Sequence, residues 1–192
     1  MFAQNGNEVG AQCNTSSNIE SEFRAKIEEF SSKNKTISSK FTQTKKILNI
    51  KNSIVTKGDF YYTNNGSLSL IYSEPKGDKI VMQGENFSIT TAGKTISSKA
   101  SNNPVLSQIA IMMQGCMSGD LSNFNKGWEL IITQNSGEYI VDLLPTSRRI
   151  KKYILSINMR FNAADMTLNQ LKINEASGGY TSYCFTDKML NL

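Results

Sequence analysis

Short segments in which apolar and polar residues alternate recur along most of this chain, with turn residues between them. The clearest is Tyr153–Phe161, where every second residue is large and apolar. A period of two is typical of a β-strand that buries one face. Asn64-Asn65-Gly66 and Glu74-Pro75-Lys76-Gly77 have the composition of tight turns. The pattern therefore predicts antiparallel strands joined by hairpins.

The predicted strands belong to a single domain over residues 17–192, because we find neither an internal repeat nor an interdomain linker. A chain of 192 residues is long enough to bury a sizeable core. Residues 1–16 are polar and are predicted to form a disordered arm. The predicted strands are Thr36–Lys46, Ile54–Thr63, Leu68–Tyr72, Ile80–Gln83, Phe87–Thr91, Trp128–Ile132, Tyr139–Leu143, Tyr153–Phe161, Met166–Asn174 and Tyr180–Phe185.

An amphipathic helix is predicted before the first strand. Ser17-Asn18-Ile19-Glu20 has the composition of a capping box, which marks a helix start. Phe23, Ile27 and Phe30 continue from Ile19 at helical spacing, in a helix of about 16 residues. A single apolar stripe predicts that this helix packs on a sheet.

A second helix is predicted from Asn103 and Pro104 to Met117, and more than half of its circumference is apolar. Such a helix must be covered on several sides. It is either a core element or a lid over an apolar ligand. Its methionines favour the lid, because flexible thioether side chains adapt to variable apolar shapes.

The net charge of +5 does not by itself predict a nucleic-acid partner. The 21 basic residues are scattered, with only short groups such as Lys45-Lys46 and Arg148–Lys152. A nucleic-acid binder concentrates such charge and places aromatic residues among it. We therefore expect a solvated basic surface and no nucleic-acid binding, and a weak attraction to anionic lipid head groups is compatible with this composition.

The three cysteines, Cys13, Cys116 and Cys184, do not form a disulfide framework. Cys116 and Cys184 lie in apolar surroundings and are expected to be small buried hydrophobic residues. A Cys116–Cys184 bridge is the alternative that the sequence leaves open.

The sequence lacks the residues that common catalytic sites need. It contains no histidine, which removes the usual general base and the Ser-His-Asp and Cys-His sites. Its carboxylates are scattered, and no phosphate-binding glycine motif occurs. We therefore expect a binding protein that uses no catalytic residue, metal or cofactor.

Several local motifs, taken in order, resemble the LolA family of outer-membrane lipoprotein carriers. The resemblance covers roughly residues 20–187 and depends on the order and spacing of the motifs. The motifs are Phe41-Thr42-Gln43, Gly58–Tyr62, Leu68–Pro75, Asp78–Gly84, Leu171–Glu175 and Gly178–Phe185.

This resemblance implies an α+β fold, an incomplete, unclosed antiparallel β-barrel with helices that cover its concave face. It implies a carrier in the periplasm. Such a carrier takes lipidated proteins from an inner-membrane transporter to an outer-membrane acceptor, and it holds their acyl chains in an apolar cavity without a cofactor. The polar N-terminus lacks the apolar core of a signal peptide, so either a signal has been removed or the protein is cytosolic. We expect a monomer.

Two positions depart from the family pattern. Asn64 stands where the family has an arginine that holds the lid by hydrogen bonds, and Leu70 stands where it has a tryptophan. Charge-assisted hydrogen bonds are stronger than neutral ones, so lid gating should differ here. A module for another amphiphile, such as a glycolipid or fatty acid, and an interaction domain with a filled core remain the alternatives.

The candidate acyl-binding residues are the apolar residues expected on the inward faces of the strands and on the second helix. They are Leu68, Leu70, Tyr72, Ile80, Met82, Phe87, Ile89, Leu106, Ile109, Met112, Met113, Met117, Trp128, Leu130 and Ile132.

Overall fold

The computed structural model describes residues 11–84, 86–99, 111–115, 117, 121 and 127–191, with the backbone alone for residues 11–16. Residues 111–115 and 117 are helical. The other elements are α1 (Ala11–Lys33), β1 (Thr36–Lys46), β2 (Ile54–Thr63), β3 (Ser67–Tyr72), β4 (Lys79–Gln83), β5 (Asn86–Thr91), β6 (Lys94–Lys99), β7 (Trp128–Asn135), β8 (Glu138–Pro145), α3 (Arg148–Lys151), β9 (Ile154–Asn162), β10 (Leu168–Glu175) and β11 (Tyr180–Leu190).

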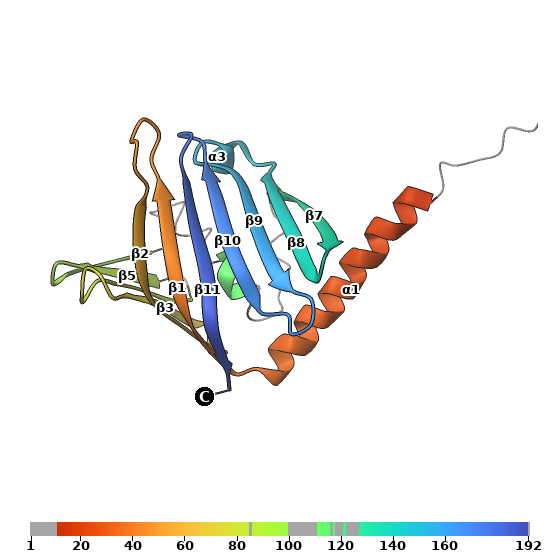
Figure 1. Ribbon diagram of the computed structural model, residues 1–192, viewed down its shortest axis with the longest axis horizontal. Coiled ribbons are helices and arrows are strands. Elements are labelled where there is room, and N and C mark those ends of the chain that lie inside the picture. The colour runs from red at the N-terminus through yellow and green to blue at the C-terminus, as the bar shows by residue number, and fades with distance from the viewer. Residues whose placement is uncertain are drawn as a thin grey trace, which may run out of the picture.

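The described strands form one antiparallel sheet in the order β6-β5-β4-β3-β2-β1-β11-β10-β9-β8-β7 (Figure 1). Its two halves join where β1 pairs with β11, with Phe41 opposite Phe185. β6 and β7 form the two edges of this sheet, so the barrel stays open. The predicted α+β half-barrel is confirmed.

One face of the sheet is apolar from β5 through to β7, because the register places large side chains opposite one another. Leu143, Ile157 and Ile173 lie side by side on β8, β9 and β10, and all three are buried. The opposite face carries a polar ladder, in which Asn158 donates to Asp142 (2.5 Å) and Asn174 donates to Asn158 (2.9 Å). This difference makes the first face the core side of the sheet.

Helix α1 begins at Ala11, before the predicted capping box, so the predicted start at Ser17 was wrong. Ser17–Glu20 lies inside the helix. The predicted apolar stripe is confirmed, because Phe23, Ile27 and Phe30 are buried. The helix lies against the β7 side of the sheet (Figure 1). Residues 1–10 of the predicted arm lie outside the described residues.

The predicted bounds of β1 and β2 are confirmed. β3, β4, β5, β8 and β9 differ from their predictions by one or two residues, and β7 continues three residues past Ile132. β6 was not predicted, because Ile96 is its only large apolar residue; it forms because Ile96 pairs with Ile89 of β5. β10 begins at Leu168 because Met166 has a φ of 57° and belongs to the preceding turn. β11 continues past Phe185 to Leu190.

The alternation in β9 breaks near its start. Asn174 of β10 lies opposite Ser156 while Glu175 lies opposite Ile154, so Leu155 is an extra residue in β9. Such a bulge turns the residues before it to the other face. Tyr153 and Leu155 are therefore exposed and Ile154 is buried, against the predicted face of this strand.

Cys184 is exposed and carries no disulfide, so the expectation of a buried residue and the alternative of a bridge to Cys116 were both wrong. Its neighbours Tyr183 and Phe185 are buried, and alternation turns Cys184 outward. Cys116 itself lies outside the described residues. No described helix has the length and apolar character that crossing a bilayer requires.

Candidate functional site

The predicted strand residues all lie on the apolar, concave face of the sheet. On one half, Leu68, Met82 and Phe87 lie opposite one another, as do Leu70, Ile80 and Ile89. On the other half, Leu130 lies opposite Leu143 and Ile132 lies opposite Val141. Six of the predicted residues are buried, and the other four are half-buried. The buried ones are Leu68, Leu70, Met82, Phe87, Trp128 and Ile132, and the half-buried ones are Tyr72, Ile80, Leu130 and Ile89.

The described part of the second helix, here called the cover segment, comprises residues 111–115 and 117. Met112, Met113 and Met117 are buried within the same core as the sheet residues. The predicted Leu106 and Ile109 lie outside the described residues. The structure thus brings the three methionines and the concave face of the sheet together.

A cavity beside the cover segment is small. Between Met117 and the side chains of Phe30, Phe60 and Phe185 lies a cavity of about 10 Å³. This is room for about one water molecule. This cavity is therefore too small for an acyl chain while Met117 and the three aromatic rings keep these positions.

A hydrogen bond from Gln114 ties the cover segment to the sheet. The side-chain amide of Gln114 donates to the carbonyl oxygen of Gly66, at 2.9 Å, in the turn between β2 and β3. This is the turn in which the resemblance placed the lid latch at Asn64. Asn64 is exposed, and its backbone N–H donates to the carbonyl of Lys35 at 2.9 Å. The contact with the cover segment is thus made by Gly66, two residues after Asn64.

Gln114 was not among the predicted residues. The sequence signal that points to Gln114 is its position directly after Met112 and Met113, because its side-chain amide can both donate and accept hydrogen bonds. A buried or half-buried amide normally finds a partner. That the partner is a carbonyl of the β2–β3 turn follows only from the three-dimensional arrangement.

A more polar pocket of about 200 Å³, here called the mouth pocket, lies at the end of the concave face near the β3–β4 turn. Gln43, Thr56, Tyr72, Pro75, Asp78, Lys79, Ile80, Ile89, Thr90 and Thr91 line it. The hydroxyl of Tyr72 donates to Oε1 of Gln43 at 2.6 Å. Thr56 contributes a buried hydroxyl that has no hydrogen-bond partner among the described residues. The pocket therefore combines the apolar side chains of Pro75, Ile80 and Ile89 with several polar groups, a mixture that suits an amphiphile.

Two tyrosines connect the mouth pocket to the core. Burial raises the pKa of Tyr72, and it raises the pKa of Tyr183 well above its usual value. The Tyr72 ring packs edge-on against Phe41 with 5.3 Å between centroids, and the Tyr183 ring lies 6.1 Å from the same phenylalanine. Both tyrosines therefore stay protonated at a pH at which an exposed tyrosine ionises.

Helix α1 forms a fixed wall on the other side of the concave face. Phe23 packs edge-on against Tyr139 and Phe161, with ring centroids 5.4 and 5.3 Å apart. The Tyr139 hydroxyl donates to Glu22 (2.7 Å) and accepts from Lys26 (3.0 Å). Burial, followed by the hydrogen bond to Glu22, raises the pKa of Tyr139. These contacts anchor α1 through both aromatic packing and polar bonds.

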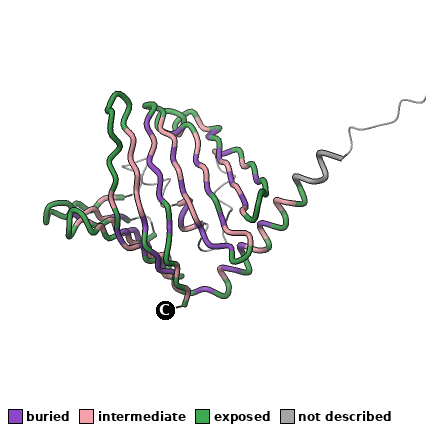
Figure 2. The backbone as a smooth tube through the Cα atoms, viewed as in Figure 1, coloured by how far each residue is buried: buried purple, intermediate pink, exposed green. Residues whose placement is uncertain are grey.

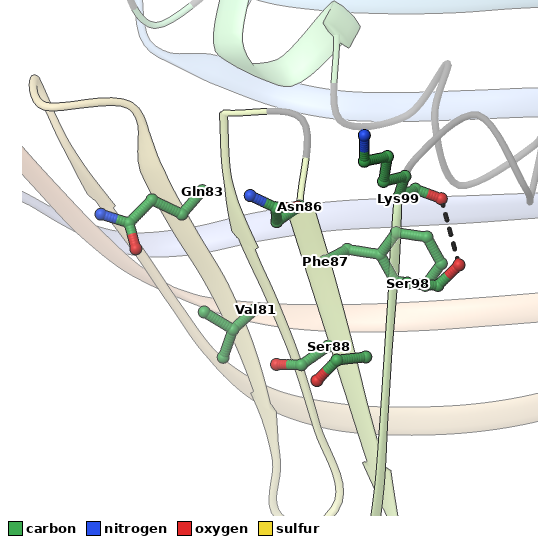
Figure 3. A pocket seen from close by; sticks show the side chains of 8 residues that line it. Val81, Gln83, Asn86, Phe87, Ser88, Ser98 and Lys99 are labelled. Atoms are coloured by element: carbon green, nitrogen blue, oxygen red, sulfur yellow. Dashed lines mark hydrogen bonds between the residues drawn. The ribbon is translucent and has the colours of Figure 1, made fainter.

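A further pocket of about 420 Å³ lies along the edge strands β4–β6 (Figure 3). Gln83, Asn86, Ser88 and Lys99 are among its lining side chains. Val81 lies opposite Ser88, on the face of the sheet away from the Leu68–Met82 pair. Most of its lining residues are polar, but Phe87 of the concave core also contributes to it.

A model of the family described as "Outer membrane lipoprotein carrier protein LolA" matches residues 32–191 of this sequence. The chain belongs to the LolA family. This confirms the resemblance stated from the motifs and covers all eleven strands. Comparison of the sequence with curated proteins finds no match.

Solved structures resemble this LolA-family chain at very low sequence identity. A DUF1329 family protein from Desulfovibrio piger is 7% identical with a TM-score of 0.51, over 91% of this chain and 93% of the other. The MucA/MucB complex of Pseudomonas aeruginosa contains a chain that is 8% identical, with a TM-score of 0.50, over 90% of this chain and 57% of the other. A LolA superfamily protein from Nitrosomonas europaea is 11% identical with a TM-score of 0.45, over 90% and 93%. At such low sequence identity, structural similarity is evidence about the fold alone.

Proposed function

We propose that this protein is a periplasmic carrier that holds the acyl chains of lipoproteins and transfers them from the inner to the outer membrane. The observation that supports the proposal is a concave apolar face whose described helical cover buries three methionines and is hydrogen-bonded to the sheet through Gln114 and Gly66. Family membership supports the same activity. An inner-membrane transporter and an outer-membrane acceptor are the partners that this activity requires.

Binding is driven by transfer of the acyl chain from water to the apolar concave face, and release requires that this face be covered again. Each methylene that leaves water contributes about 0.8 kcal/mol, so one long acyl chain contributes on the order of 10 kcal/mol before costs. Strong binding is therefore easily reached, and release is the harder step. When Met112 and Met113 return to the concave face, they cover the lining that the departing chain exposes, and release becomes less costly.

Native mass spectrometry of the full chain, purified from a diderm bacterium, tests the proposal. We expect bound lipoproteins or their acyl chains, and binding of a fluorescent fatty acid in the lipid-free state. Met113→Asp should reduce probe binding strongly, because a charge on the concave face opposes an acyl chain. Met189→Asp is the matched control, since Met189 is exposed.

Parallel loss of probe affinity and thermal stability in Met113→Asp would identify the cover segment as ordinary core, against the proposal. Recovery of a small amphiphile instead of lipoproteins would favour the second candidate, a module for a glycolipid or fatty acid. The polar groups of the mouth pocket, Gln43, Thr56 and Tyr72, favour that candidate, because they can bind a polar head group. If the chain binds neither ligand nor probe, the remaining candidate is an interaction domain with a filled core.

A further inference from the structure

The hairpin between β1 and β2 presents a group of bare aliphatic side chains. Ile47, Leu48, Ile50, Ile54 and Val55 are between 37% and 56% exposed. Single exposed apolar residues are ordinary, whereas a group of them on one protruding tip marks a surface that binds something. Figure 2 shows the tip as a continuously exposed loop that extends beyond the sheet.

The same tip is strongly basic. Lys45, Lys46, Lys51 and Lys57 lie in or beside it, and the sequence between Lys45 and Lys57 contains no aspartate or glutamate. Lys46 donates to the carbonyl oxygens of Ile50 (2.5 Å) and Lys51 (2.8 Å), so it shapes the loop from within. The remaining lysines surround the aliphatic residues with positive charge.

A second basic segment lies at the same end of the sheet (Figure 1). Leu48 lies so close to Gly178 in the β10–β11 turn that an added Cβ there would come within 3.3 Å of it. The N–H of Ala176 in that turn donates to the carbonyl of Tyr153 at 2.9 Å, next to α3. The turn therefore connects the hairpin tip to α3.

Segment 148–155 repeats the composition of the hairpin tip. Arg148, Arg149, Lys151 and Lys152 are exposed, as are the apolar side chains of Tyr153 and Leu155. Glu175, at the end of β10 before the turn, accepts hydrogen bonds from the hydroxyls of Thr181 (3.1 Å) and Ser177 (3.3 Å). We call residues 45–57 and 148–155 together the basic end.

We propose that the basic end docks the protein on an anionic membrane surface. Lysine and arginine are attracted to anionic head groups, and the exposed aliphatic side chains can enter the boundary between head groups and acyl chains. Lysine suits this arrangement because its charged end reaches the head groups while its stem lies along apolar surface. Nucleic acid provides no apolar phase for five aliphatic side chains, so the composition favours a bilayer.

The mouth pocket lies at the base of the same hairpin. Gln43 precedes the tip on β1, Thr56 follows it on β2, and both line the pocket. On a docked molecule the mouth pocket would lie near the bilayer, where an acyl chain enters or leaves. This orientation rests on the proposed function, whereas docking itself does not.

Co-sedimentation of the full chain with lipid vesicles tests the proposal. We expect binding to vesicles of phosphatidylglycerol and phosphatidylcholine, weaker binding to phosphatidylcholine alone, and a loss of binding as salt increases. The double variants Leu48→Asn/Ile50→Asn and Arg148→Gln/Arg149→Gln should each reduce binding about tenfold or more. Ile96→Asn is the control, because Ile96 is exposed on edge strand β6, outside the basic end.

Equal binding to both vesicle types, or equal loss in the Ile96→Asn control, would overturn the proposal. So would a concentration-dependent dimer that disappears in Leu48→Asn/Ile50→Asn, because the tip would then bind a second copy. Fatty-acid probe binding without vesicles, measured on the same variants, separates the two proposals. Docking without probe binding contradicts only the carrier function, and probe binding without docking contradicts only the docking.

Discussion

Gln114 on the cover segment and Gly66 in the β2–β3 turn are joined by a hydrogen bond of 2.9 Å from the side-chain amide to the backbone carbonyl. The donor is on the helix, whereas the latch implied by the family resemblance would have its donor at position 64. A neutral amide bond is weaker than a charge-assisted one. This relationship predicts a cover that is released at a modest energetic cost.

Gln114→Ala should therefore make the concave face more accessible. Loss of a neutral hydrogen bond costs about 0.5–1.5 kcal/mol in the closed state, so the free energy of unfolding should fall by about that amount. The association rate of a fluorescent fatty acid, measured by stopped-flow, should rise. Gln134→Ala, at an exposed position on β7, is the control and should change neither value. An unchanged association rate in Gln114→Ala would mean that this bond does not restrain the cover.

Stability should fall at alkaline pH because of the buried tyrosines. In the unfolded chain a tyrosine ionises near pH 10. Burial keeps Tyr183 and Tyr72 protonated at higher pH in the folded state. Above pH 10 the unfolded state thus binds fewer protons than the folded state, and stability is lost as pH rises towards the folded-state pKa values.

Tyr183→Phe should flatten this alkaline loss, measured by urea unfolding at a series of pH values. Tyr61→Phe is the control, since Tyr61 is exposed. If the wild-type chain and Tyr183→Phe lose stability with the same slope, burial of Tyr183 does not control alkaline unfolding.

Gly58 is predicted to tolerate no side chain. A Cβ at this position would lie 2.1 Å from the carbonyl oxygen of Ile71 and 2.8 Å from the Phe41 ring. Overpacking of this kind costs about 1–3 kcal/mol, and the contact with backbone places Gly58→Ala at the upper end. Gly84→Ala is the matched control, because a Cβ at this position would meet nothing within 4 Å. An alanine at the φ of 56° found there is expected to cost only about 1–2 kcal/mol. Chemical denaturation measures both, and a smaller loss in Gly58→Ala than in Gly84→Ala would contradict the assigned packing.

Phe23→Ala should destabilise the fold by about 3–5 kcal/mol, because Phe23 is buried between the rings of Tyr139 and Phe161. Tyr61→Ala removes an exposed aromatic ring and should cost far less. Thermal unfolding followed by circular dichroism compares the two. Similar losses in both variants would show that α1 is not held by its aromatic contacts.

Much of the fold was accessible from the sequence because the responsible interactions are local. The bounds of β1 and β2 follow from side-chain alternation and from the turn at Asn64-Asn65-Gly66, and these signals act over a few residues. β6 escaped prediction because its only large apolar residue, Ile96, is exposed, and the strand exists through its pairing with β5. The outward direction of Cys184 could have been deduced from its buried neighbours.

The sequence by itself determined the alternating strands, the stripe of α1 and the methionine-rich composition of the cover, since periodicity and turn propensity are properties of short segments. Only the tertiary structure decided that β1 pairs with β11, that Gln114 meets Gly66 and that the hairpin tip adjoins α3. Those relationships join residues far apart in the chain. They arise when burial of one continuous apolar face selects a single arrangement of the strands, and no local pattern contains that information.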